Sequence, residues 1–392
     1  MPTHTASDTT HFATADVAPD VLQQMTSDAV GEPVRIIGTR PRPFDYDWGS
    51  IPTAGLWRVD VDYDGTRRGT YSYFVKLLRN PLLWPQLSTI PEQFRAAFLE
   101  QLPWRFEYDI HDSGIAAVLP DGMRMANLHH VKTIGNDYLS LWWEYVELDE
   151  KPWTVDDYAR TAFLLGRLAA RRRKGAAVNA QLPQVCHSYP DGGALRYYTE
   201  MRVLARALPS LKDPGLWQHP IIAQALAATG DAELPAAMCA VGERIPAILD
   251  RLDTLPQTFA HGDASPQNLL IPAADRSERI VIDWGFGTPL PVGFDLGQLL
   301  IGLAHAGELD PDDLGGVDAA ILPTYLDGLA DEGYAVDPAA VRYGYVGGMT
   351  ARSALVSLPT ELLDEPDDST LELMTQRLRL TRVLVDMAQS LE

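Results

Sequence analysis

The 392-residue chain has little cysteine and comparatively few basic side chains, and both features exclude classes of protein. Its two cysteines, Cys186 and Cys239, cannot form a disulfide framework and lack the paired spacing of a metal site. With 53 acidic and 32 basic side chains the net charge is −21, and an acidic surface repels a phosphate backbone. We therefore expect two buried thiols and no nucleic-acid partner.

The sequence also lacks a membrane span and a positively charged start. No uncharged apolar run approaches the roughly 18 residues that a membrane helix needs. The first basic residue is Arg35, so the basic region of a secretory signal and the arginines of a transit peptide are both missing. We therefore expect a cytoplasmic protein without a membrane partner.

The chain divides into an N-terminal tail and two regions that differ in their predicted secondary structure. Residues 1–33 are rich in Thr, Ser, Asp and Ala, which predicts a flexible tail that orders only if it docks. Residues 34–148 are mainly strand-like and residues 149–392 mainly helical, which predicts an α+β fold with a small β-rich N-lobe and a larger helical C-lobe. Strands are predicted at 44–48, 56–63, 70–78, 115–119 and 138–146, with a turn at Asp64-Gly65, and helices at 91–102, 154–174, 234–252, 295–306, 319–330, 338–358 and 369–391.

One segment, 259–284, interrupts the helical region and has the composition of a β-hairpin. Symmetrical pairing of its two apolar runs places Leu269 opposite Ile282. Asn268 and Asp283 then also face each other, with Cβ atoms roughly 4.5–5.5 Å apart. An amide oxygen beside a carboxylate suits Mg²⁺, which binds through one or two protein groups, waters and substrate phosphates.

A carboxylate and a lysine complete the groups that phosphoryl transfer requires. Asp263, five residues before the amide, could reach a substrate hydroxyl and act as the catalytic base. Lys76 lies on a predicted strand between apolar neighbours, where an inward lysine is costly unless it is paired. We expect Glu107 to be its partner, with Glu100 and Asp109 as competitors.

These residues resemble the signature of a known family. The ordered set is His-Gly-Asp at 261–263 with Asn268, Ile-Asp-Trp at 282–284, and Gly-Phe-Asp-Leu at 293–296. It is similar to that of the aminoglycoside phosphotransferase and choline kinase-like family, which shares the two-lobed protein-kinase fold. The resemblance implies ATP or GTP and Mg²⁺ as cofactors, a hinge near 144–148, and an acceptor site in the C-lobe.

The resemblance also implies a role for each matching position. The loop 49–55, with Ser50, takes the place of the phosphate-covering loop without a full Gly-x-Gly-x-x-Gly pattern. The implied roles are Asp263 as catalytic base, Asn268 and Asp283 as magnesium ligands, Lys76 with Glu107 for the nucleotide phosphates, His261 and Asp295 as supports of the catalytic loop, and the backbone of Glu144 and Val146 for the adenine edge.

The acceptor is expected to be a small molecule, because Asp-Trp-Gly at 283–285 is not followed by a recognisable activation segment. Residues 301–392 hold 17 acidic and five basic side chains, which favours a cationic alcohol such as an aminoglycoside, an amino sugar or a choline-like compound. A neutral sugar, a macrolide or a nucleoside antibiotic is the alternative. The sequence gives no oligomeric state.

Three other interpretations stay open. Asp, Asn and Gly favour turns, so the motif residues could belong to an ordinary hairpin. The chain could also be a catalytically silent nucleotide-binding module, similar to a pseudokinase. A metal-dependent hydrolase would use His261, Asp263 and Asp283 as ligands, which would leave Asn268 and Lys76 without a task.

Overall fold

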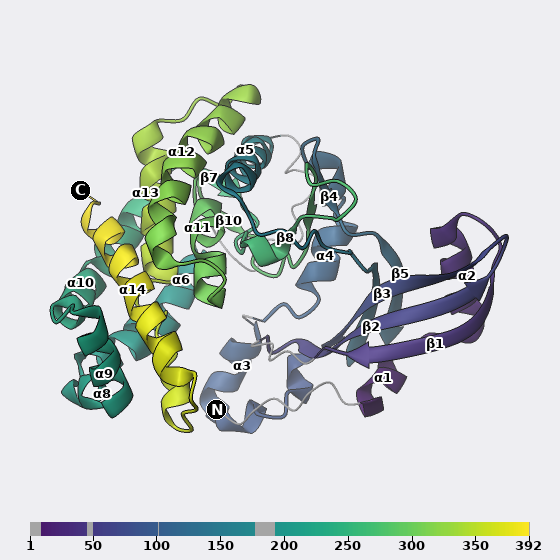
Figure 1. Ribbon diagram of the computed structural model, residues 1–392, viewed down its shortest axis with the longest axis horizontal. Coiled ribbons are helices and arrows are strands. Elements are labelled where there is room, and N and C mark those ends of the chain that lie inside the picture. Colours follow the sequence, from purple (N-terminus) through teal and green to yellow (C-terminus); the bar gives the residue numbers. More distant parts are fainter. Residues whose placement is uncertain (1–8, 45–49, 101, 177–192, 392) are drawn as a thin grey trace. The chain divides into compact units, whose positions relative to one another are not determined.

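The computed structural model describes residues 9–44, 50–100, 102–176 and 193–391, which form two compact units (Figure 1). One is β-rich and the other mainly helical, which confirms the predicted fold class. Residues 113–124 cluster with the helical unit, although the sequence assigned them to the N-lobe. Unit 1 comprises Met1–Asp112, Met125–Asp149 and Pro272–Arg276, and unit 2 comprises Ser113–Arg124, Glu150–Ile271 and Ser277–Glu392.

Unit 1 is built on a five-stranded antiparallel sheet with the order β1-β2-β3-β6-β5. Asp64 pairs with Arg68 across the predicted β2–β3 turn. The predicted strand at 44–48 lies outside the described residues except for Phe44, and the first strand is formed by earlier residues. The strands are β1 (Arg35–Pro43), β2 (Thr53–Asp64), β3 (Arg68–Arg79), β5 (Leu128–Ile134) and β6 (Tyr138–Glu144).

Two short helices, α3 (Glu92–Glu100) and α4 (Phe106–Asp112), follow the third strand. Pro103 separates them, because the residue before a proline disfavours helical geometry. The 3₁₀ turns η1 (Pro81–Leu83) and η2 (Leu87–Thr89) precede them. The predicted strand at 115–119 was wrong: it is the 3₁₀ turn η3 (Ile115–Val118), which begins after the left-handed Gly114. So short an apolar run does not distinguish helix from strand.

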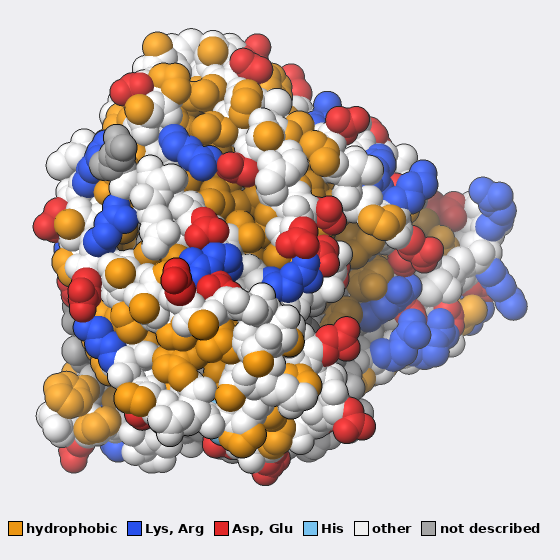
Figure 2. All heavy atoms as spheres, turned by 60° about the vertical axis from the view of Figure 1, so that its left-hand side comes forward, with side chains coloured by type: hydrophobic (Ala, Val, Ile, Leu, Met, Phe, Trp, Pro, Cys, Tyr) orange, Lys and Arg blue, Asp and Glu red, His pale blue; other side chains and the backbone are white. Residues whose placement is uncertain are grey.

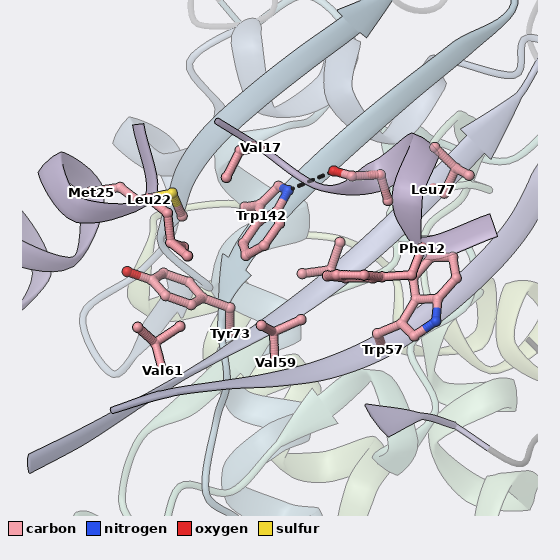
Figure 3. Close-up of a cluster of buried hydrophobic side chains, with 12 residues drawn as sticks. Phe12, Val17, Leu22, Met25, Trp57, Val59, Val61, Tyr73, Leu77 and Trp142 are labelled. Carbon is pink, nitrogen blue, oxygen red and sulfur yellow. Dashed lines mark hydrogen bonds between the residues drawn. The ribbon is translucent and has the colours of Figure 1, made fainter. Parts of the chain in front are cut away.

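The N-terminal region packs against the sheet as two helices, α1 (Thr9–Ala15) and α2 (Pro19–Val30). The Phe12 ring lies 5.6 Å from that of Trp57 and 6.3 Å from that of Trp142 (Figure 3). The Trp142 indole N–H and the Ser140 hydroxyl both donate to the Ala15 carbonyl, at 3.1 and 2.8 Å. The segment that the sequence assigned to a flexible tail is therefore docked from Thr9 to Val30.

Unit 2 is mainly helical. The predicted capping box is present, since Thr154 accepts from the Asp157 N–H and Asp157 accepts from the Thr154 N–H. The sequence did not reveal the short helices between 193 and 229, which three prolines interrupt. The helices are α5 (Val155–Arg171), α6 (Gly193–Tyr198), the π-helix η5 (Thr199–Ala207), α7 (Leu208–Lys212), α8 (Pro214–Gln218), α9 (Pro220–Thr229), α10 (Leu234–Leu252), α11 (Asp295–Ala306), α12 (Leu314–Asp331), α13 (Pro338–Arg352) and α14 (Thr370–Gln389).

Two small sheets carry the segment between α10 and α11, in the orders β4-β9-β8 and β10-β7. Within the described ranges, no helix is both long and apolar enough to cross a membrane. The strands are β4 (Met123–Met125), β7 (Gln257–Phe259), β8 (Leu269–Leu270), β9 (Arg279–Val281) and β10 (Pro289–Pro291), and the 3₁₀ turns are η6 (Pro266–Asn268), η7 (Pro311–Asp313) and η8 (Thr360–Leu363).

The docked N-terminal helix yields a test of stability. Phe12 is 8% exposed, so Phe12→Ala should lower the free energy of unfolding of unit 1 by about 3–5 kcal/mol, the usual cost of truncating a buried Phe. Phe94→Ala, at a site that is 60% exposed in the same unit, is the control and should change it by under about 0.5 kcal/mol. Urea unfolding followed by tryptophan fluorescence measures both, and equal effects would contradict the docking.

Candidate functional site

The hairpin pairs one residue out of the predicted register. Leu269 lies opposite Val281, and the predicted pairing with Ile282 was wrong. The Ile282 N–H donates to the Asn268 carbonyl at 3.0 Å, so Asn268 faces Ile282 and not Asp283. Pro272, just beyond this pairing, forms an isolated antiparallel bridge with Leu148. The assumption that the two apolar runs pair symmetrically therefore did not predict the register of the hairpin correctly.

Asp283 has a φ of 53° and is the only non-glycine residue with positive φ in the described part of the chain. The left-handed region is costly for most residues, and Asp and Asn tolerate it best. Such backbone strain clusters at functional sites. The turn after β9, and not strand alternation, therefore sets the direction of the Asp283 carboxylate.

Asn268 ends the turn η6 and is hydrogen-bonded to Asp263, the predicted base. Its Nδ2 donates to the Asp263 carbonyl at 2.9 Å and to the Asp263 carboxylate oxygen Oδ2 at 3.2 Å. The amide nitrogen is thereby committed to Asp263, which leaves Oδ1 as the Asn268 atom suited to a cation. The amide oxygen and the Asp283 carboxylate are hard oxygen donors and fit Mg²⁺, which completes its shell with water and phosphate oxygens.

The described residues contain no group of three or more His, Cys, Asp or Glu side chains placed to hold a metal ion. His261 is fully buried, and both of its ring nitrogens are engaged. Nδ1 accepts from the Asp263 N–H at 3.2 Å, and Nε2 lies 2.9 Å from the Ile282 carbonyl and donates to it. This tautomer leaves no lone pair for a metal, so His261 does not fit the ligand set of a hydrolase.

Asp295, at the start of α11, holds the backbone of the same loop. Its carboxylate accepts from the His261 N–H at 3.0 Å and from the Gly262 N–H at 2.8 Å. Burial raises the pKa of Asp295, and the two N–H donors oppose that shift. His261 and Asp295 thus both accept hydrogen bonds from the backbone of residues 261–263, which agrees with the predicted role of supporting this loop.

Gly262 occupies a position that a larger residue cannot enter. It has a φ of 81°, and a Cβ atom there would lie 2.1 Å from the Phe286 carbonyl oxygen. The glycine therefore allows the chain to turn into Asp263 while passing close to the segment after β9.

In unit 1 the structure joins Lys76 and Glu107 in an ion pair of 2.6 Å, with side chains only 11% and 13% exposed. Lys76 lies on β3 between Leu56 of β2 and Leu141 of β6, and Glu107 lies in the first turn of α4. A charge this deeply placed requires a partner, which the sequence correctly named. The competing Asp109 lies near Arg105, and burial raises the pKa of Asp109.

The remaining predicted nucleotide contacts are ordinary loop and strand-end positions. The Glu144 N–H donates to the Asn127 carbonyl at 2.8 Å, and Val146 lies half-buried just beyond β6. Ser50 is exposed, and its carbonyl accepts from the Thr53 N–H at 3.2 Å. Their roles at the adenine edge and the phosphates stay predictions.

The sequence missed Arg352, the last residue of α13. Its guanidinium donates to Asp263 Oδ1 at 2.8 Å and to the Gly262 carbonyl, and it lies 4.7 Å from the centre of the Phe286 ring. In sequence, an arginine at the end of a predicted helix reads as a cation that complements the helix dipole. No local pattern indicates that it meets a residue 89 positions earlier.

Residues 155–336 match the sequence model of the phosphotransferase enzyme family, APH. The matched stretch begins with α5 and includes the whole of the segment 259–284 and α12. The match agrees, over this stretch of the chain, with the predicted family resemblance and with a phosphotransferase as the class of enzyme. No curated protein sequence matches the chain.

The solved structures to which the chain is similar include aminoglycoside phosphotransferases. One from Alicyclobacillus acidocaldarius is 14% identical and covers 89% of this chain and 90% of its own, with a TM-score of 0.46. One from Streptomyces rimosus, in complex with ADP and streptomycin, is 13% identical and covers 80% and 92%, with a TM-score of 0.41. At this level of similarity neither activity nor substrate transfers to the chain.

The close approach at Gly262 predicts a strong effect of one added methyl group. Gly262→Ala should destabilise unit 2 by about 1–3 kcal/mol more than Gly307→Ala, because a Cβ atom at Gly262 overlaps backbone. Gly307 is a matched control, since its φ is 79° and nothing lies within 4 Å of a Cβ atom there. Thermal unfolding of both variants measures the difference, and equal melting temperatures would contradict the overlap.

Proposed function

We propose that the protein transfers the γ-phosphate of ATP, or of GTP, to a hydroxyl group of a small molecule. The arrangement of Asp263 carries the proposal. Its carboxylate is held on one oxygen by Asn268 and on the other by Arg352, while its backbone N–H is held by His261. A carboxylate fixed in this way suits the orientation of an acceptor hydroxyl for attack on phosphorus.

The other groups divide the remaining tasks. Asn268 and Asp283 would hold Mg²⁺, which neutralises developing charge on the phosphate oxygens when it is bound. Lys76, oriented by Glu107, would hold the α and β phosphates of the nucleotide. Ser50 and the backbone of Glu144 and Val146 would complete the nucleotide contacts. Because phosphoryl transfer needs little covalent help from the protein, this set is sufficient.

The acceptor class follows from charge. The acids of residues 301–392 favour a cationic alcohol, such as an aminoglycoside, an amino sugar or a choline-like compound. Part of that charge is already paired, since Arg379 lies 2.6 Å from both Asp310 and Asp312. Figure 2 shows red and blue side chains interspersed over much of the visible face. A neutral sugar, a macrolide or a nucleoside antibiotic is therefore the second candidate class.

Two of the other interpretations, a catalytically silent nucleotide-binding module and a metal-dependent hydrolase, fit less well. A silent nucleotide-binding module normally lacks a core group, whereas the sequence contains all of Lys76, Asp263, Asn268 and Asp283. A hydrolase would need His261 as a metal ligand, and its ring nitrogens are occupied.

Removal of the proposed base tests the activity directly. Asp263→Ala should lower turnover by about 10²–10⁴-fold, the usual contribution of a general base, while ATP binding with Mg²⁺ changes little. Turnover is measured as ADP release over aminoglycosides, amino sugars, choline analogues, macrolides and nucleosides. Asp364→Ala, at an exposed position, is the control. Full activity of the Asp263 variant would remove this residue from the role of base.

Removal of the proposed metal ligand should have a different signature. Asp283→Ala should lose the part of ATP affinity that depends on Mg²⁺, because the carboxylate supplies a ligand that water replaces poorly. Calorimetry with and without Mg²⁺ measures this part for the variant and for the unaltered chain. An unchanged magnesium dependence would exclude Asp283 as a ligand.

A further inference from the structure

We propose that Arg352 is a positioning residue for the catalytic base, an inference that rests on the proposed function. Neither the sequence motif nor the family resemblance assigns Arg352 a role. It acts through Asp263 and not through the nucleotide.

The contacts of Arg352 are divided between the side chain and the backbone of one loop. One guanidinium nitrogen donates to the Asp263 carboxylate at 2.8 Å, and the other donates to the Gly262 carbonyl. A planar guanidinium that holds two acceptors in fixed directions restricts both the loop and the carboxylate plane. Rotation of the Asp263 carboxylate would break one of these bonds or the bond from Asn268.

The position of the guanidinium is itself fixed by packing. The Arg352 side chain is 14% exposed and lies over the Phe286 ring at 4.7 Å. Phe286 belongs to the segment that also approaches Gly262. Arg352 therefore ties the end of α13 to the catalytic loop, with the aromatic ring as a backing surface.

The positive charge has a second consequence at the base. In the proposed function the carboxylate of Asp263 works beside the negatively charged phosphate chain of the nucleotide, which repels it. A guanidinium 2.8 Å away offsets part of that repulsion and is only partly screened by water. Arg352 thus favours the geometry in which the base and the phosphate approach each other.

The same helix offers a matched control. Arg342 of α13 also pairs with a carboxylate, that of Asp318 at 2.7 Å, and also lies over an aromatic ring, that of Tyr345 at 5.3 Å. These contacts lie on α12 and α13, and neither residue belongs to the loop 261–263. Arg342→Gln therefore removes a similar interaction without touching the site.

The experiment compares Arg352→Gln, Arg352→Lys and Arg342→Gln in the full chain. ADP release from MgATP is measured with water as the acceptor and with each alcohol that is active in the screen. Arg352→Gln should lower kcat about 10- to 100-fold, the cost of a misplaced reacting group, with the KM for MgATP within about twofold. Arg352→Lys should recover part of the loss, and Arg342→Gln should retain kcat within about twofold.

A double variant tests whether Arg352 acts through the base. In the Asp263→Asn background, Arg352→Gln should change the residual rate by less than about twofold, because the group that it positions is already gone. A further loss of about 10- to 100-fold in the Asp263→Asn background would overturn the proposal. An Arg352→Gln variant as active as Arg342→Gln would overturn it as well. If Arg352→Gln does not fold, Arg352→Lys and the double variant with lysine carry the same comparison.

The proposed function fails by a different result. An unaltered chain that releases no ADP with any acceptor would overturn both proposals. A chain that is active and indifferent to position 352 would overturn only this one.

Discussion

The loop 261–263, which carries the proposed base, depends on one buried carboxylate, that of Asp295. It accepts two consecutive backbone N–H groups, those of His261 and Gly262, and thereby fixes the chain immediately before Asp263. A buried acid without such donors would cost about 1–3 kcal/mol or more. The cation of Arg172, fully buried over the rings of Phe259 and Trp284, also counteracts the rise in the pKa of Asp295 that burial causes.

A second acidic residue, Asp263, is then held from three places, two of them through its carboxylate and one through its backbone N–H. Asn268 of the turn η6, His261 of the loop itself and Arg352 of α13 each contact a different atom of this residue. Unit 1 shows the same principle on a smaller scale, because Lys76 on the sheet pairs with Glu107 at 2.6 Å. In both units a hydrogen-bond or ion-pair partner restricts the orientation of a charged side chain.

Much of the site could be predicted from the sequence, since the chemistry of phosphoryl transfer needs particular residue types at particular spacings. Asp263, Asn268 and Asp283 lie within one hairpin, where short spacing limits how far apart they can be. Lys76 and Glu107 required a long-range guess, which the cost of an unpaired buried lysine supported. The register was beyond that reasoning, because the composition of two short apolar runs does not distinguish pairings that differ by one residue.

The sequence by itself determined the local features: the capping box at Thr154, the longer helices of the second unit, the β2–β3 turn and the phosphotransferase motif. These depend on residues close together in the chain, whose preferences act before any packing. Only the tertiary structure decided that Phe12 docks on the sheet, that Asp283 turns through a left-handed conformation and that Arg352 meets Asp263. Each of these depends on contacts between distant segments or on a balance of strain and packing, and neither leaves a periodic trace in the sequence.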